Sequence, residues 1–144
     1  MKRADLYLLS TPSMTEQVEF CCRLCEKAVD DFQRIHIQTQ QSIQNEALDT
    51  ALWSFKAESF LPHEVGQDKK TRAPILIDTN PLDPAHFLES NLLILLGNSL
   101  PENAGQFDRL CIVVANHEPD IQQAREIYKQ LARQKIEVHI HDRR

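Results

Sequence analysis

Two uninterrupted apolar runs constrain the fold of this chain more than any other feature of its sequence. They read LLILL at 92–96 and LCIVV at 110–114. Such runs are typical of strands buried on both faces, as in a parallel sheet that helices cover on its two sides. The sequence therefore predicts an α/β fold.

Weaker patterns predict the remaining elements. Further strands are expected at 5–9, 34–38, 74–78 and 136–140, and helices at 14–31, 41–55, 83–89 and 118–134. Because strands and helices alternate along the chain, we expect a single domain over residues 1–144. Its predicted architecture is a Rossmann-like, mostly parallel sheet with helices on both faces.

Charge and hydropathy argue against a general nucleic-acid binder, a membrane protein and a secreted protein. The net charge of −5 argues against a surface that binds nucleic acid throughout. A short basic run at Lys69, Lys70 and Arg72 keeps direct DNA binding open as an alternative. No apolar run approaches the roughly 18 residues of a membrane span, and the run after Lys2-Arg3 is too short for a secretion signal. A cytoplasmic protein is expected.

The glycines give little support to nucleotide binding. The chain has only Gly66, Gly97 and Gly105, so neither G-x-G-x-x-G nor a P-loop nor G-x-S-x-G is present. The segment 10–13 after the first strand lacks the glycines that let a backbone approach phosphate closely. No cofactor and no catalytic residue are predicted. A nucleotide- or metal-dependent enzyme on the same scaffold remains an alternative.

Cysteine and histidine spacing gives little support to a metal site. Three of the four cysteines share one helical face with Val18 and Val29, which is typical of core residues; the four are Cys21, Cys22, Cys25 and Cys111. His139 and His141 share one face of the last expected strand, where a solvated edge strand is the simpler interpretation. No metal is predicted.

The single tryptophan is predicted to lie on the polar side of its helix, where an apolar side chain is unexpected. In a helix over 41–55, Trp53 projects into the polar half, beside Glu46 and Asp49, with Asn45 and Thr50 in the same half. Either the later segment 57–66 covers the indole or the indole stays open to a partner. Even when covered, Trp53 would form one apolar surface cluster with Phe60, Leu61 and Pro62. Exposed aromatic clusters of this kind mark protein–protein contacts.

The helix expected at 118–134 carries a basic ridge. Arg125, Lys129 and Arg133 follow each other at intervals of four, beside an apolar arc that has Tyr128 at its border. Such charges usually form a solvated flank. They also suit an acidic peptide ending in a hydrophobic residue, whose carboxylates need cations and whose side chain needs a pocket.

Both anomalies fall in segments that resemble a known family. The segments LDTALW, ESFLPHE, APILI and AREIYKQLARQKIEVHIHD, together with the opening ADLYLLS, are similar to the chi subunit of bacterial DNA polymerase III. The resemblance covers nearly the whole chain, and LDxALW followed by SFxPH is its most specific part.

The resemblance implies a non-catalytic accessory protein of the clamp loader with two partners. One is the psi subunit, whose site maps here to Trp53, Phe60, Leu61, Pro62 and His63. The other is the acidic C-terminal tail of single-stranded DNA-binding protein (SSB), whose site maps here to Val114, Arg125, Tyr128 and Lys129. Association with DNA would then be indirect.

Two positions depart from the family pattern. Ile121 stands one turn before Arg125, where a basic residue can add to the peptide site. The turn after this helix is Arg133-Gln134-Lys135 instead of a small or glycine-containing step. The peptide site is therefore expected to be less cationic.

Overall fold

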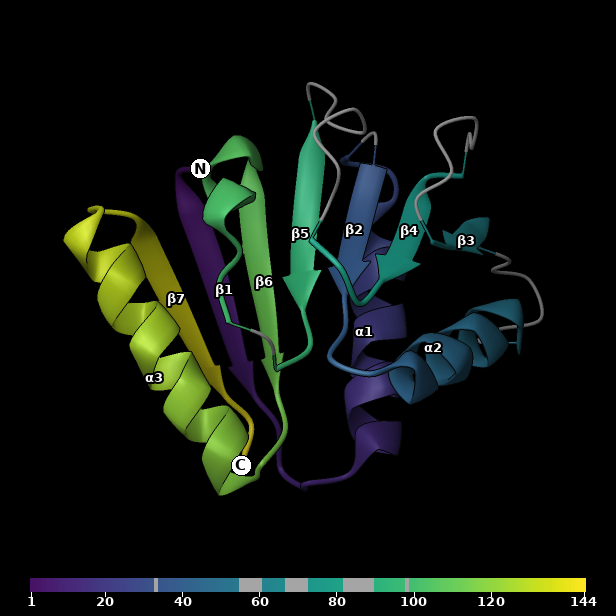
Figure 1. Cartoon of the computed structure of the whole chain (residues 1–144), viewed down its shortest axis with the longest axis horizontal. Coiled ribbons are helices and arrows are strands. Elements are labelled where there is room, and N and C mark those ends of the chain that lie inside the picture. The colour runs from purple at the N-terminus through teal and green to yellow at the C-terminus, as the bar shows by residue number, and fades with distance from the viewer. Residues whose placement is uncertain (33, 55–60, 67–72, 82–89, 98) are drawn as a thin grey trace.

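The computed structural model describes residues 1–32, 34–54, 61–66, 73–81, 90–97 and 99–144. Within these ranges the chain forms one all-parallel sheet of seven strands in the order β3-β4-β2-β5-β6-β1-β7 (Figure 1). The strands are β1 (Arg3–Leu8), β2 (Arg34–Gln38), β3 (His63–Val65), β4 (Ile75–Asp78), β5 (Asn91–Leu95), β6 (Arg109–Val114) and β7 (Glu137–Asp142).

Helices cover both faces of the sheet, as predicted. Helices α1 (Met14–Ala28) and α2 (Ser42–Ser54) pack on one face, and α3 (Glu118–Arg133) packs on the other with the 3-10 turn η2 (Glu102–Gln106) (Figure 1). Successive side chains of the apolar runs point to opposite faces, so Leu92 and Ile94 join the core under α1, whereas Leu93 and Leu95 join the core under α3. The runs are apolar throughout because both faces are buried.

Several sequence expectations need correction. β3 forms at His63–Val65, where no strand was expected, α1 ends at Ala28 instead of residue 31, and β7 runs to Asp142. Asn45, placed on the polar half of its helix, is buried, and its side-chain oxygen accepts a hydrogen bond from the Thr39 hydroxyl. The short helix expected at 83–89 lies outside the described residues.

Helix α3 ends in a turn that needs a left-handed residue, and in this chain that residue is not glycine. Lys135 adopts a left-handed φ of 59°. Its N–H donates to the Ala132 carbonyl, and the N–H of Ile136 donates to the Leu131 carbonyl, both at 3.1 Å. These two bonds form a Schellman motif, in which the left-handed residue is usually glycine. The turn predicted to be atypical thus keeps the usual geometry with lysine.

A buried carboxylate joins the three strands β6, β1 and β7 at one end of the strand order. Asp5 on β1 is fully buried and accepts hydrogen bonds from Arg3 (3.0 Å), Arg109 on β6 (2.7 Å) and His141 on β7 (2.9 Å). Burial alone would raise the pKa of Asp5, but the three donors outweigh it and lower the pKa to about 2. The edge strand β7, which pairs with β1, is tied to the sheet by this charge.

Candidate functional site

A groove of about 410 Å³ opens between α3 and the β1–β7 pair. One wall is α3, and the other is formed by alternate side chains of the two paired strands, where Leu6 stands opposite Ile140 in register. Its lining residues are Leu6, Leu8, Ile121, Ala124, Arg125, Tyr128, Lys129, Ile140 and Arg144. Leu6 and Ala124 are buried, whereas Tyr128 and Ile140 remain 42% and 54% exposed. The groove thus offers an apolar floor with exposed apolar side chains.

Three cations stand at the groove, and each has an exposed carboxylate nearby. Arg125 lies 3.8 Å from Glu118, and Lys129 lies 3.5 Å from Glu126. Pairs at these distances and exposures contribute little to stability, so a ligand can replace the carboxylate at small cost. An acidic ligand would therefore meet cations that are available for exchange.

The third cation, Arg144, is held more firmly. Its Nε and one terminal nitrogen donate to the two carboxylate oxygens of Asp142 at 3.0 and 2.9 Å. These hydrogen bonds lower the pKa of Asp142 to about 2. Arg144 lies on the wall opposite Ile121, which is apolar and lines the same groove. The charge missing at Ile121 is thus supplied across the groove.

The structure brings together most of the peptide-site residues expected from sequence. Arg125, Tyr128 and Lys129 all line the groove, but Val114 does not. Val114 is 2% exposed and belongs to the core under α3 together with Ala124. Sequence reasoning missed four lining residues, Leu6, Leu8, Ile140 and Arg144. The alternation along 136–140 was the signal for Ile140, but the neighbouring strand could not be identified from it.

A second candidate surface surrounds the tryptophan at the end of α2. Trp53 is 63% exposed, so its expected outward placement is correct. Its ring meets the edge of His63 at 5.5 Å between centroids, with the planes at 72°. Pro62 beside it is exposed and Leu61 is buried. Phe60, assigned to the same surface, lies outside the described residues.

His63 fixes the position of this surface. Its side chain is buried, and its two ring nitrogens lie 2.7 Å from the Leu61 carbonyl and 2.8 Å from the Asp49 carboxylate. The contact with Asp49 joins β3 to α2, so the helix that carries Trp53 is held to the strand that directly follows Pro62. An exposed indole on a fixed support is a typical interface anchor.

The loop after β1, where related sheets bind phosphate, already holds a negative charge. The Glu16 carboxylate accepts hydrogen bonds from the Ser10 hydroxyl (2.7 Å) and the Thr11 N–H (3.0 Å). These bonds lower the pKa of Glu16. The Ser10 hydroxyl and the Thr11 N–H are therefore already bonded to a carboxylate of this chain.

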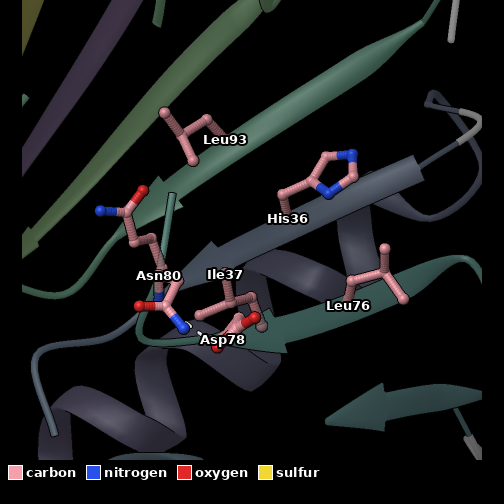
Figure 2. Close-up of a pocket in the computed structure, with 7 residues that line it drawn as sticks. His36, Ile37, Leu76, Asp78, Asn80 and Leu93 are labelled. Atoms are coloured by element: carbon pink, nitrogen blue, oxygen red, sulfur yellow. Dashed lines mark hydrogen bonds between the residues drawn. The ribbon is translucent and has the colours of Figure 1, made fainter. Parts of the chain in front are cut away.

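The carboxyl ends of the central strands also leave little space for a nucleotide. A hollow of about 20 Å³ lies among His36, Leu76, Asp78, Asn80 and Leu93 (Figure 2). That volume holds about one water molecule. His36 is a buried core residue whose Nε2 lies 3.2 Å from the Asn91 side-chain oxygen. The described residues thus form no nucleotide cleft here.

The candidate metal ligands have other partners. All four cysteines are buried and none forms a disulfide, and burial raises the pKa of Cys22 and of Cys111 to about 12. His139 and His141 each lie within 3 Å of a carboxylate, those of Glu137 and Asp5. In the described part of the chain, no three potential ligands converge on one point. The basic run 69–72 lies outside those residues.

Comparison with known proteins shows which family this chain belongs to. The model of the DNA polymerase III chi subunit family (HolC) matches residues 1–139. The chain belongs to this family. The chi subunit of DNA polymerase III from Pseudomonas aeruginosa is 30% identical over 124 residues, which cover 86% of this chain and 84% of that protein. The chi subunit from Haemophilus influenzae is 26% identical over 130 residues, or 90% of each chain.

Family membership gives the chain a part in DNA replication. Chi is an accessory subunit of the polymerase and does not catalyse synthesis. No helix of the described residues has the length and apolarity of a membrane span.

Proposed function

We propose that this chi-family protein is a replisome adaptor with two separate binding surfaces, acting in the cytoplasm. The groove between α3 and β7 binds the acidic C-terminal tail of SSB. The surface around Trp53 binds a psi-like subunit of the clamp loader. Joining two weak sites in one molecule raises the effective concentration of the polymerase machinery at protein-coated single strands.

The tail-binding proposal rests on one observation: a single groove combines an apolar floor with positively charged residues around it. A tail that ends in a hydrophobic residue presents an apolar side chain beside its terminal carboxylate. The floor accepts the side chain, and Arg125, Lys129 and Arg144 surround it with positive charge. Arg125 and Arg144 offer planar guanidinium groups that bind a carboxylate through two parallel hydrogen bonds, and Lys129 acts as a point charge.

The psi-like surface is supported by exposure and by rigidity. Trp53 is the most exposed large apolar side chain of the described residues. Its support, through His63 and Asp49, limits the entropy lost when a partner covers the indole. A buried indole is the kind of anchor that dominates interface energetics.

A peptide titration tests the groove. A labelled acidic peptide with a hydrophobic C-terminal residue is titrated against the wild type and against Arg125→Ala, Lys129→Ala and Arg133→Ala. Arg125→Ala is expected to weaken binding about tenfold or more, because hydrogen bonds to charged groups are worth about 1.5–3 kcal/mol. Lys129→Ala should cost less. Arg133→Ala is the matched control, since Arg133 lies on α3 but does not line the groove.

Two changes to the peptide test which of its groups the groove recognises. Amidation of the C-terminus removes one charge, and replacement of the terminal hydrophobic residue by Asp removes the apolar anchor. Both should weaken binding to the wild type. Added salt should weaken binding without abolishing it, because salt screens the exposed cations but not the apolar contact. Equal affinity of all four proteins for the peptide would remove α3 from the site.

A further inference from the structure

A second hollow lies on the opposite face of the β1–β7 pair. It has a volume of about 160 Å³ and is bounded by α1, β1 and the residue that follows β7. Its lining residues are Tyr7, Phe20, Arg23, Leu24, Lys27 and Arg143. Three of the six are cations, and none is acidic.

These three cations differ from those of the tail-binding groove. Within the described part of the chain, Arg23, Lys27 and Arg143 form no ion pair, whereas Arg125, Lys129 and Arg144 each have a carboxylate within 4 Å. Arg23 and Lys27 are exposed and one turn apart on α1. A cluster of like charges without counter-charges attracts an anion, because bringing the cations together costs energy that a bound anion recovers.

A buried ring holds two of these cations near each other. The guanidinium carbons of Arg23 and Arg143 lie 5.9 and 5.1 Å from the centroid of Phe20. Cation–π contacts of this kind stabilise a guanidinium without neutralising it. The positive charge therefore remains available to a ligand.

The hollow continues along α1. An adjoining hollow of about 170 Å³ shares Tyr7, Leu24 and Lys27 with the first and adds Arg109 at its far side. Arg109 is bound to Asp5, but its side chain is 37% exposed. Asp31 also lines this second part. Together the two hollows, here called the α1 trough, form an extended path with positive charge along it.

We propose that the α1 trough binds the sugar–phosphate backbone of single-stranded DNA. Successive phosphates match a row of cations, and rings such as Tyr7, stacked on His141 at 4.5 Å, border the path. The small volumes of the two hollows, about 160 and 170 Å³, suit a flexible single strand better than a duplex. The site is compatible with a net charge of −5, because Arg23, Lys27 and Arg143 form a local cluster of positive charge.

The α1 trough does not overlap the tail-binding groove. The trough lies on the α1 face of the sheet and the groove on the α3 face, on either side of β1 and β7. A weak DNA site next to a tethering site is effective because the tether supplies a high local concentration. The DNA site itself requires only the contacts of the α1 trough.

The experiment is a titration of labelled oligothymidylate against the intact protein, from about 50 to about 200 mM salt. Three phosphate contacts predict a slope of about −2 for the logarithm of affinity against the logarithm of salt. The variant Arg23→Gln/Lys27→Gln should lose at least tenfold at low salt and show a shallower slope. The control Arg133→Gln/Lys135→Gln has the same net charge and should change affinity less than twofold. Melting curves confirm that both variants fold.

Three results would overturn the proposal. The first is an absence of salt-dependent binding by the wild type at low salt. The second is an equal loss in the control variant, which would indicate a diffuse electrostatic effect. The third is tighter binding of an acidic peptide than of oligothymidylate, abolished by Arg23→Gln/Lys27→Gln, which would assign the trough to a protein ligand. A duplex that binds more weakly than the single strand supports it.

Discussion

Replacing Asp5 by asparagine should destabilise the protein and loosen β7, the edge strand that contributes Ile140 to the tail-binding groove. Asp5 is buried, and its carboxylate accepts hydrogen bonds from Arg3, Arg109 and His141. Asparagine keeps the shape but removes the negative charge that the three donors surround. Because His141 lies on β7, the substitution also weakens the attachment of the edge strand.

The size of the effect follows from the pKa of Asp5. Its pKa falls from an ordinary 3.8 to about 2 in the folded protein. At about 1.4 kcal/mol per pKa unit, the folded environment favours the ionised carboxylate by about 2 kcal/mol at neutral pH. The loss in Asp5→Asn should be close to that, because Arg3 and Arg109 are 40% and 37% exposed and water can solvate them.

Urea unfolding at several pH values measures this contribution. A lowered folded pKa means that the stabilisation is present above pH 4 and is lost as the pH falls from about 4 to about 2. The difference in unfolding free energy between wild type and Asp5→Asn should therefore be about 2 kcal/mol at pH 7 and should shrink toward pH 2.

Asp142→Asn is the matched control. The pKa of Asp142 is also lowered to about 2, through Arg144, but this pair is exposed to solvent. Exposed pairs contribute little to stability, so Asp142→Asn should leave the unfolding free energy nearly unchanged. Equal destabilisation by the two substitutions, or a difference between wild type and Asp5→Asn that is independent of pH, would refute the reasoning.

Four further predictions concern the core, the end of α3 and the two binding surfaces. Leu131→Ala removes a fully buried side chain from the core under α3 and should cost about 2–5 kcal/mol of unfolding free energy in urea titrations. Lys135→Gly relieves a left-handed residue and should raise the unfolding free energy by up to about 1 kcal/mol in the same assay. Trp53→Ala should leave the melting temperature nearly unchanged, because the indole is 63% exposed, and should weaken capture of a psi-like subunit by about 2 kcal/mol; a loss of stability as large as that of Leu131→Ala would place Trp53 in the core. Arg144→Gln should weaken binding of the acidic tail peptide in anisotropy titrations, and Asp142→Asn should strengthen it by releasing Arg144 from a competing carboxylate; unchanged affinity in both would remove Arg144 from the site.

Local patterns in the sequence predicted most of the described elements. The runs at 92–96 and 110–114 predicted doubly buried strands because a strand between two helical layers has no wet face. Helical spacing predicted that Arg125, Tyr128 and Lys129 share one flank of α3 and that Trp53 faces outward. These features depend on residues within a few turns of each other, and chain periodicity describes them well.

The tertiary structure decided which elements are neighbours. β3 escaped prediction because three residues, His63–Val65, are too few to show alternation, and they form a strand through pairing with β4. Asn45 was misplaced because its partner, Thr39, lies outside the helix that the projection describes. The opposite wall of the tail-binding groove could not be predicted, since Leu6 and Ile140 are far apart in the chain and meet through the pairing of β1 with β7. Strand order is set by the packing of all layers together, and no local spacing encodes it.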